Sequence, residues 1–352
     1  MTDPLALGST IGILGGGQLG RMLAMSAAKL GYNTHILAPE ERPPAAQVAT
    51  TTTQAAYDDT TALQAFAARV DVVTYEFENI PLATAKYLEG HVPLCPGAKA
   101  LEVSQDRLTE KTYLQGLGLA TAPFVDVADI GSLRAALQTL GTPAILKTRR
   151  FGYDGKGQMR FDTAQDLGPA DGILDQPCLL EGFVDFTAEV SVIAARGKSG
   201  EVVAYDPGQN VHKDGILRTT TVPAPIPSRL STDAVLLAGR ILNALDYVGV
   251  LGVELFVTPK GLVVNEIAPR VHNSGHWTEA ACAVSQFEQH IRAITGLPLG
   301  NGARHSDARM DNLIGAEVEH WSNGAAGLHI YGKGSAREGR KMGHITHLSA
   351  KS

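Results

Sequence analysis

The sequence predicts an α/β protein, α+β in part, with two or three domains. Near the N-terminus, short apolar strands alternate with helical segments up to about residue 100, which is typical of βαβ units in a parallel sheet. Further along, short apolar runs separated by turns continue to about residue 268, and three more strand-like pieces follow in the tail. The chain has 352 residues, which is long for a single hydrophobic core.

The N-terminal segment predicts a Rossmann-like βαβ domain over residues 1–103. Its first strand leads into a turn in which Gly15, Gly17 and Gly20 fit the pattern G-x-G-x-x-G, and a helix follows. Glu40 lies about 20 residues further on, where an NAD enzyme carries its ribose-binding acid. On its own this pattern favours a nicotinamide cofactor. The same turn also serves any phosphate-bearing ligand at a helix N-terminus, or only the tight packing of helix on strand.

The rest of the chain divides at a linker-like stretch. We expect a middle domain over residues 104–298 and a small β-rich domain over residues 299–352. Ser104 is placed to cap a helix from Gln105 to Gln115, because serine before a helical run and glycine after it mark helix ends. A further helix is expected from Ser285 to Thr295.

Composition argues against several classes of function. The formal net charge of -6 and the lack of any Lys/Arg run argue against nucleic acid as a partner. No apolar run is long enough for a membrane span, and the N-terminus lacks a signal peptide, so a cytoplasmic protein is expected. The three cysteines are isolated and odd in number, which favours reduced, buried thiols.

Two carboxylates on a predicted β-hairpin indicate a metal site. Glu254 and Glu266 each lie in an apolar run, and Pro259-Lys260-Gly261 separates the two runs. Pairing Thr258 with Leu262 across that loop sets Glu254 directly opposite Glu266, with Cβ atoms roughly 4.5–5.5 Å apart. Opposed like charges destabilise an apolar hairpin unless cations lie between them, and hard oxygen ligands favour magnesium. The alternative is a shifted register with both side chains in solvent.

A second glycine-rich stretch predicts a phosphate-binding flap. It runs from Phe151 to Gln158 and follows Lys147, which ends an apolar strand. Glycines let backbone N–H groups approach phosphate oxygens closely, and lysines supply compact positive charge. The pattern is not that of a P-loop, so we expect a mobile flap over a triphosphate. The alternative is a plain hairpin loop.

Other polar residues are weaker candidates when taken alone. Glu181 ends an apolar strand whose edge suits an adenine ring, although an ordinary strand end is the alternative. Glu189 is an isolated acid at the start of another strand, and His212 lies in a segment rich in polar donors. Arg340 and Lys341 belong to a basic group that is either a solvated face or an anion site.

Together these stretches resemble the ATP-grasp superfamily, and several are closely similar to its N5-carboxyaminoimidazole ribonucleotide synthetases. The resemblance rests on residues 17–22 (GQLGRM), 152–158 (GYDGKGQ), 212–218 (HKDGILR), 265–277 (NEIAPRVHNSGHW) and 339–344 (GRKMGH). These stretches span nearly the whole chain. The resemblance implies an ATP-grasp fold with an N-terminal Rossmann-like domain, a central ATP-grasp domain and a small C-terminal β-rich domain.

The resemblance also implies roles for individual residues. ATP would be held by Arg107, Lys147, Gly152, Tyr153, Asp154, Gly155, Lys156, Gly157, Gln158, Glu181, Gly182, Phe183, Val184, Glu189, His212, Asn265 and Glu266. The ribonucleotide would be surrounded by Gln18, Leu19, Glu76, Tyr153, Asp154, Arg270, His272, Asn273, Ser274, Arg340 and Lys341. Catalysis would depend on Lys147, Asp154 and Arg270, and two magnesium ions are expected at Glu254 and Glu266. Many relatives carry Asn two residues after the second metal Glu, where this chain has Ala268 and therefore lacks that ligand.

The reaction that the resemblance implies is carboxylation of 5-aminoimidazole ribonucleotide with ATP and bicarbonate, through carboxyphosphate, in purine biosynthesis. Either carboxyphosphate or CO2 released from it is attacked, and either Asp154 or phosphate takes the amine proton. A homodimer is expected from the family. The alternatives are another ATP-grasp ligase, an NAD-dependent dehydrogenase, and an inactive nucleotide-binding regulator, which would be expected to lack Lys147 or one of the paired carboxylates.

Overall fold

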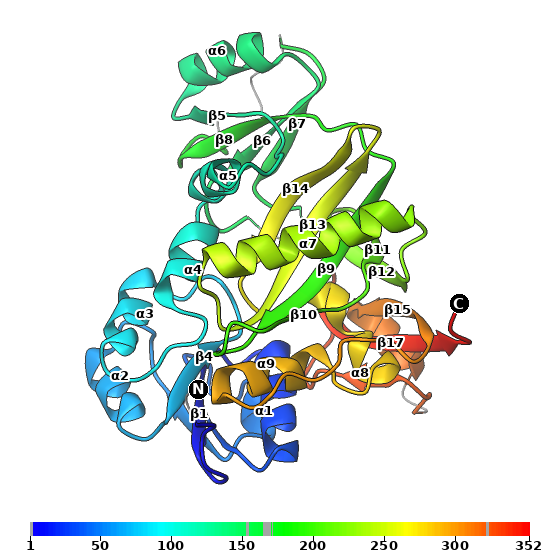
Figure 1. The fold of residues 1–352 in the computed structure, drawn as a ribbon. Helices are drawn as coiled ribbons and strands as arrows, with labels where there is room; N and C mark the ends of the chain where they lie inside the picture. The colour runs from blue at the N-terminus through cyan, green and yellow to red at the C-terminus, as the bar shows by residue number, and fades with distance from the viewer. Residues whose placement is uncertain (1–2, 153–154, 165–169, 171, 322–323) are drawn as a thin grey trace.

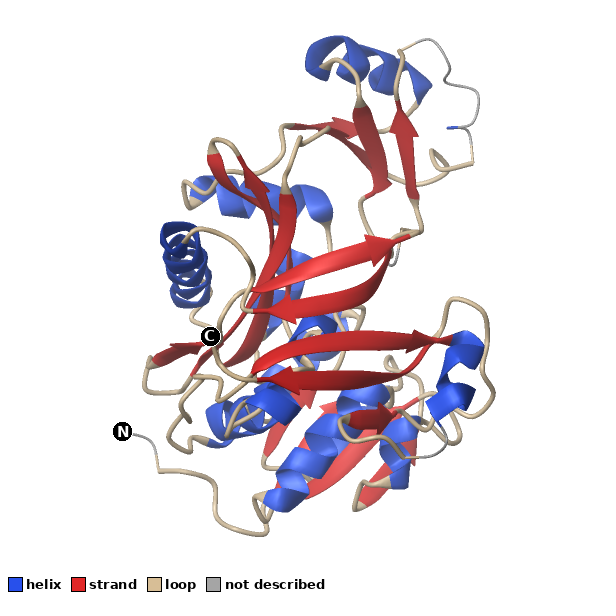
Figure 2. Cartoon of the chain, turned by 90° about the vertical axis from the view of Figure 1, so that its right-hand side faces the viewer, coloured by secondary structure: helices blue, strands red, loops and turns tan. Residues whose placement is uncertain are grey.

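The computed structural model describes residues 3–152, 155–164, 170, 172–321 and 324–352. Its described strands form three sheets, and Figures 1 and 2 show a small sheet at the end of the molecule opposite the N-terminal sheet, with a large sheet between them. The mixed α/β architecture predicted from the sequence is confirmed. None of the described helices combines the length and the apolar character needed to span a bilayer.

The N-terminal sheet is parallel throughout, in the order β3-β2-β1-β4. Its strands are β1 Thr10–Leu14, β2 Asn33–Ala38, β3 Thr51–Gln54 and β4 Val72–Tyr75. The helices of this part are α1 Gln18–Lys29, α2 Thr60–Ala67 and α3 Leu82–Glu89, with the short 3-10 helix η1 Pro44–Gln47. The predicted βαβ pattern is confirmed. Strand β3 was not predicted because its threonines are mostly exposed at the sheet edge and leave no apolar signal.

The large sheet has nine strands, and its ladders are antiparallel. They are β9 Ala188–Arg196, β10 Val202–Ala204, β11 Gly208–Lys213, β12 Ile216–Val222, β13 Gly249–Thr258, β14 Gly261–Ala268, β15 Asp307–Ile314, β16 Leu328–Ile330 and β17 Lys341–Ser349. The C-terminal strands do not form a sheet of their own, because β15 pairs with β12 and extends the large sheet. The remaining short helices of this part are η3 Asn273–Gly275, α8 Thr278–Ala281 and η4 Gly315–Trp321.

The small sheet is joined to the rest by two consecutive helices. Its strands run in the order β5-β8-β6-β7, and α6 Ile130–Leu140 packs on it. The strand bounds are β5 Phe124–Val127, β6 Ala144–Thr148, β7 Gln158–Phe161 and β8 Cys178–Gly182. The joining helices are α4 Ala98–Ser104 and α5 Arg107–Gly116, and Figure 1 shows α5 between the small sheet and β14.

The predicted helix cap at Ser104 is wrong. Ser104 ends α4, and Asp106 caps α5 by accepting hydrogen bonds from the backbone N–H groups of Leu108 at 3.0 Å and Thr109 at 3.3 Å. A carboxylate suits this place because the N-terminus of a helix carries unpaired donors and partial positive charge. Asp106 lies two positions after Ser104, and both are residue types that cap helices well. Helix α4 ends at Ser104, and α5 begins at Arg107.

A β-bulge sets the register of the β13–β14 hairpin. Thr258 pairs with Gly261, not with the predicted Leu262, so the connection contains only two residues. Regular pairing from that turn would place Glu254 opposite Asn265 and send Glu266 to the other face. One extra residue on β14, Asn265, lies between the Leu255–Val264 pair and the next pair, so the register shifts and Glu254 faces Glu266 after all. The predicted carboxylate pair is confirmed, although the predicted turn is wrong.

The two faces of β9 belong to two different cores. Val192 and Ala194 pack with α7, Ser228–Ala244, whereas the alternating residues Ile193 and Ala195 pack with α9, Gln286–Thr295, and with α1. This alternation is what a strand buried on both faces requires. The helix predicted from Ser285 to Thr295 is confirmed, and Ser285 is its cap, accepting a hydrogen bond from Glu288 N. The three cysteines are buried free thiols, also as predicted.

One buried histidine joins the N-terminal sheet to the large sheet. His290 on α9 accepts a hydrogen bond from Val250 N on β13 at 3.1 Å, and its other ring nitrogen lies 2.8 Å from Thr74 Oγ1 on β4. Burial lowers the pKa of His290 to about 3. The native ring is therefore neutral, and the unfolded chain binds one more proton below about pH 6.5.

We expect His290→Leu to lower the free energy of unfolding at pH 8 by about 2–4 kcal/mol, because two buried polar groups lose their partner. Below pH 6.5 the unfolded wild-type chain binds a proton that the native His290 ring does not, so the wild type loses stability as pH falls towards 3. The difference in free energy of unfolding between wild type and variant should therefore shrink by about 2 kcal/mol at pH 5. Urea unfolding of both proteins at the two pH values measures this. The exposed His305→Leu is the control. A difference that is the same at both pH values would contradict the prediction.

Candidate active site

A cleft lies beside α5, between the small sheet and the large sheet. Its walls come from the end of β4, from α5, from the loop after β6 and from the end of β14. They include Glu78, Arg107, Glu110, Arg149, Gly152, Glu266, Ala268, Arg270 and His272. Five of these, Arg107, Gly152, Glu266, Arg270 and His272, were predicted to bind ATP or the ribonucleotide, and the structure brings them together.

The Glu254–Glu266 pair is called the metal end of the site, because a metal ion was predicted there. Arg107 Nη1 lies 2.9 Å from Glu266 Oε2, and His272 Nε2 lies 3.2 Å from Glu254 Oε1. Burial and the facing Glu266 raise the pKa of Glu254 to about 7. Burial would also raise the pKa of Glu266, but the Arg107 guanidinium holds it well below its usual range. One carboxylate of the pair is thus firmly ionised, and the second exchanges its proton near neutral pH.

Two further groups flank this pair. Glu110 on α5 accepts a hydrogen bond from Ile267 N at 2.7 Å, and burial together with Glu266 raises the pKa of Glu110 to about 8. The side-chain oxygen of Asn265 is buried and accepts no hydrogen bond from any described residue. A buried oxygen without a donor is costly unless a ligand completes it. Asn265 was predicted at this position.

Glu181 and the two lysines that pair with it are called the nucleotide end of the site, because Lys147 and Glu181 were predicted to hold ATP. Lys147 Nζ lies 2.9 Å from Glu181 Oε2, and Lys111 Nζ lies 3.2 Å from Glu181 Oε1. Burial would raise the pKa of Glu181, but the two lysines hold it below its usual range. Burial lowers the pKa of Lys147, an effect that Glu181 opposes. The sequence predicted Lys147 and Glu181 but did not predict their contact, and it missed Lys111.

The glycine-rich flap is the hairpin loop between β6 and β7, where Lys147 pairs with Gln158. Gly157 has φ of 71°, and a Cβ atom there would lie 2.6 Å from Thr148 Oγ1, so only glycine fits. Gly155 packs against Gly215 in the β11–β12 turn, which joins the flap to the large sheet across the cleft. Tyr153 and Asp154, the predicted tip of the flap, lie outside the described residues.

Glu189 and His212 meet on neighbouring strands of the large sheet. His212 Nδ1 lies 3.0 Å from Glu189 Oε2. Burial would lower the pKa of His212, but Glu189 and Glu254 raise it above its usual value. Phe183 is exposed beyond the end of β8, and the Arg160 guanidinium lies 4.6 Å from its ring centroid. These predicted nucleotide residues stay predictions, since no ligand is present to show their contacts.

The glycine turn before α1 is filled by the protein itself. The Glu76 carboxylate accepts hydrogen bonds from Gly17 N and, at 2.7 Å, from Gly20 N. A Cβ atom on Gly15 would lie 2.4 Å from Glu76 Cγ, so the motif is glycine-rich to admit this side chain. A dinucleotide pyrophosphate would need the same N–H groups. The turn therefore does not support the nicotinamide alternative.

Arg270 and His272 are held by residues from three elements. Glu78, which follows β4, pairs with Arg270 Nε. His272 Nδ1 lies 2.8 Å from Ser274 Oγ, which accepts a hydrogen bond from Ser191 on β9 at 2.7 Å. Burial lowers the pKa of His272 to about 3, so the ring is neutral. Ser274 is itself buried, so its route to a ligand runs through His272.

The other predicted acceptor residues do not line the cleft among the described residues. Asn273 exchanges amide hydrogen bonds with Asn312 on β15, at 2.8 and 2.9 Å. Leu19 belongs to the hydrophobic core under α1. Arg340 donates to Lys333 O at 3.2 Å, and Lys341 begins β17. Gln18 begins α1. Their roles towards the ribonucleotide remain predictions.

Four charged residues of the site were not predicted: Glu78, Glu110, Lys111 and Arg149. Glu78 carried a usable signal, because Glu76-Phe77-Glu78 follows a parallel strand at the edge where such sheets bind ligands. Glu110 and Lys111 carried none, since adjacent opposite charges on a helix are typical of a solvent-exposed face. Their burial follows from the second sheet that closes over α5.

The fold and the site define an enzyme of the ATP-grasp class. A glycine-rich hairpin and a lysine on one sheet face paired carboxylates on another, with a cleft between them. Three family models match the chain in succession: the ribonucleotide synthetase preATP-grasp domain over residues 8–105, the ATP-grasp domain over 112–287 and the phosphoribosylaminoimidazole carboxylase C-terminal domain over 308–352. The exact domain boundaries near residues 103 and 298 remain predictions.

Individual relatives agree with these matches. The chain is 57% identical over 349 residues to the N5-carboxyaminoimidazole ribonucleotide synthase of Brucella melitensis, covering 97% of this chain and 96% of that one. It is 42% identical over 348 residues to the Bacillus subtilis enzyme of that name, covering 97% and 92%. Among solved structures, N5-carboxyaminoimidazole synthetase from Staphylococcus aureus complexed with ADP superposes with a TM-score of 0.94 at 39% identity, covering 99% and 95%.

One further solved structure contains the ribonucleotide as well as ADP. The Aspergillus clavatus N5-carboxyaminoimidazole synthase in complex with ADP and 5-aminoimidazole ribonucleotide superposes with a TM-score of 0.91 at 30% identity, covering 98% of this chain and 95% of that one. The chain belongs to the N5-carboxyaminoimidazole ribonucleotide synthase family. It is an ATP-grasp ligase of purine biosynthesis.

Proposed function

We propose that this protein carboxylates the exocyclic amine of 5-aminoimidazole ribonucleotide with ATP and bicarbonate, giving N5-carboxyaminoimidazole ribonucleotide, ADP and phosphate. The observation that carries the proposal is a cleft lined by Arg107 and Glu266, with Glu254 opposite Glu266 and with Lys147 close enough to lower the pKa of Glu266. Such a cleft suits a nucleotide triphosphate with its metal. The family membership supplies the acceptor.

The residues present fit magnesium. The donors are oxygen atoms only: two partly exposed carboxylates that face each other, with the buried Asn265 amide oxygen beside Glu266. Glu254 and Glu266 would hold the metal, and when bound it would neutralise charge on the phosphates of ATP. Ala268 lines the cleft where many relatives carry a further ligand. Water or bicarbonate would complete the coordination of the second of two magnesium ions.

The chain's own residues would then orient the nucleotide and exclude water. Lys147 and Arg107 would hold ATP phosphates, and the flap would close over them, because carboxyphosphate is short-lived in water. The adenine would lie against the end of β8, where Glu181 to Val184 were predicted to hold it. Glu189 with His212 would hold the ribose at the far strand.

The acceptor would lie against Arg270 and His272, on the side of the cleft that faces the N-terminal sheet. Arg270 is fixed by Glu78 and would stabilise the negative charge that develops on the transferred group. Arg340 and Lys341 would hold the ribonucleotide phosphate. The amine proton would pass to Asp154 or to phosphate. We also propose a homodimer located in the cytoplasm, on the basis of the family alone.

The experiment that tests the function is ATP hydrolysis with magnesium and bicarbonate, with and without 5-aminoimidazole ribonucleotide, followed by phosphate release. Strong stimulation by the ribonucleotide, with labelled bicarbonate entering the product, is the expected result. ATP binding without stimulation would contradict the proposed acceptor and turn attention to other amines.

Glu266→Gln should reduce turnover on the order of 10²-fold or more, because the amide is a weaker magnesium ligand and carries no charge. Steady-state rates over a series of magnesium concentrations measure the effect. Glu201→Gln, at an exposed position before β10, is the matched control and should behave as wild type. A near wild-type rate for Glu266→Gln at limiting magnesium would remove this residue from the metal site.

Lys341→Ala should raise the KM for the ribonucleotide roughly tenfold and leave the KM for ATP nearly unchanged, because a phosphate contact of this kind serves only one substrate. Initial rates with each substrate varied in turn give both constants. Lys260→Ala, exposed in the β13–β14 turn, is the control. Equal effects on the two KM values would place Lys341 outside the ribonucleotide phosphate site.

A further inference from the structure

One carboxylate at the nucleotide end of the cleft is shared by two lysines. Lys147 Nζ lies 2.9 Å from one oxygen of Glu181, and Lys111 Nζ lies 3.2 Å from the other. The lysines come from different parts of the fold, Lys147 from β6 in the small sheet and Lys111 from α5. Two ammonium groups on one carboxylate leave an excess of one positive charge in a mostly dry place, which is favourable only if an anion is expected there.

The two lysines are not equivalent. The Lys147 side chain is 11% exposed and lies at the cleft, whereas the Lys111 side chain is 0% exposed. Lys111 also donates a hydrogen bond to Asn265 O at 3.2 Å. A lysine is almost never fully buried unless it is paired, and these two contacts account for Lys111. Only Lys147 can therefore reach a phosphate, while Lys111 stays below the surface of the cleft.

Binding of ATP would break the ion pair between Lys147 and Glu181. A phosphate that recruits Lys147 draws the ammonium away from Glu181, and a buried carboxylate without a partner is strongly destabilised. Lys111 prevents this outcome because it is already in place and cannot leave. We propose that Lys111 is a positioning residue that holds Glu181 in place while Lys147 transfers from Glu181 to the phosphates of ATP.

The contact with Asn265 extends this role to the metal end. Asn265 precedes Glu266 and is the extra residue of the β-bulge that sets Glu266 opposite Glu254. Lys111 therefore fixes Glu181 on the small sheet and the bulge on the large sheet with one ammonium group. A nucleotide that bridges both ends of the cleft meets groups whose separation is already set, which lowers the cost of ordering them.

The inference rests on the proposed function in so far as Lys147 and Glu181 hold the nucleotide, and its test does not need the acceptor. Lys111→Met removes the charge and the hydrogen bond, while Lys111→Gln removes the charge and keeps a donor for Asn265 O. Both variants should weaken ADP binding with magnesium, measured by calorimetry, on the order of tenfold, because a charged buried partner is lost. The KM for ATP should rise similarly, and the KM for the ribonucleotide should change less than twofold.

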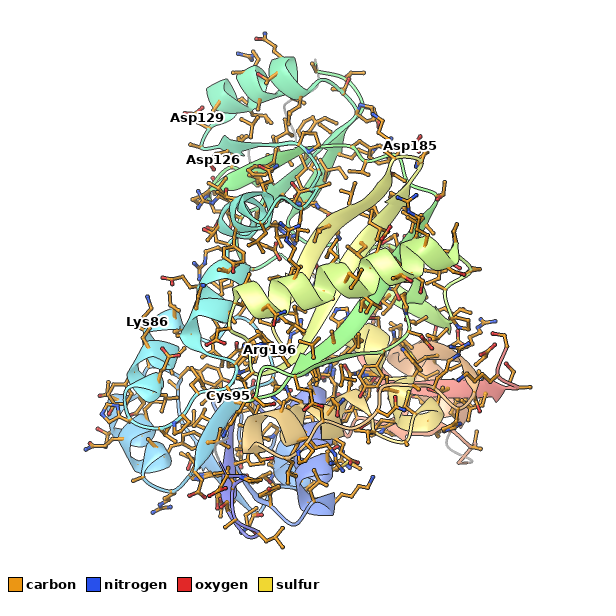
Figure 3. The ribbon with its side chains drawn as sticks, viewed as in Figure 1. Lys86, Cys95, Asp126, Asp129, Asp185 and Arg196 are labelled. Carbon is orange, nitrogen blue, oxygen red and sulfur yellow. The ribbon has the colours of Figure 1, made fainter. Side chains whose placement is uncertain are left out.

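The control is Lys86→Met. Lys86 pairs with Glu102 at 3.0 Å, but both side chains are exposed, and Figure 3 shows Lys86 on the N-terminal domain away from the small sheet. Its loss should not change ADP binding. Glu181→Gln supplies a second comparison: if Lys111 acts through Glu181, the effects of Lys111→Gln and Glu181→Gln on ADP binding should be far from additive.

Three results would overturn the proposal. They are unchanged ADP binding in a folded Lys111 variant, equal rises in both KM values, or additive effects with Glu181→Gln. Loss of folding in both Lys111 variants would assign the residue a purely structural role and would overturn it as well. If wild type binds ADP but the ribonucleotide does not stimulate phosphate release, the proposed function fails while the role of Lys111 stands.

Discussion

The site depends on the burial of one charged helix face between two sheets. Helix α5 carries Arg107, Glu110 and Lys111, and residues three or four apart on a helix lie on one side. Arg107 pairs with Glu266, Glu110 accepts from Ile267 N, and Lys111 meets Glu181 and Asn265 O. The contacts with Glu266, Ile267 and Asn265 reach β14 of the large sheet, and the contact with Glu181 reaches β8 of the small sheet. Unpaired, any of these charges would cost several kcal/mol in the interior, so the sheets are held where all three find partners.

This constraint explains why the cleft has two ends of opposite character. The small sheet supplies Lys147 and the glycine-rich hairpin, whereas the large sheet supplies the paired carboxylates. Neither sheet alone could bind a metal-bound triphosphate, because each lacks the opposite charge. Helix α5 supplies the balancing partner to both ends: a cation for Glu266 and a cation for Glu181. Glu266 and Glu181 are thereby charged and held in position, which the proposed ATP site requires.

Local patterns predicted much of this arrangement. The parallel N-terminal sheet, the hairpin with its carboxylate pair and the loop after Lys147 follow from periodicity, glycine spacing and charge in apolar runs. The turn of that hairpin was predicted wrongly, and the pair came out right only because a bulge added back the missing residue. Bulges depend on what the extra residue contacts, here Lys111. That contact, like the burial of Glu110 and the cap at Asp106, depends on segments distant in the sequence, so no local pattern reveals it.

The end of β4 shows how the N-terminal domain joins the site. Two carboxylates leave this strand two residues apart. Glu76 turns back and satisfies the glycine turn of its own domain, in the place where a cofactor phosphate would bind in a dehydrogenase. Glu78 turns forward and pairs with Arg270 after β14. Glu76 occupies the N–H groups of this turn, and the domain meets the site through Glu78, which positions Arg270. The same G-x-G-x-x-G spacing thus supports a different function, because the ligand of its N–H groups is a side chain of the protein.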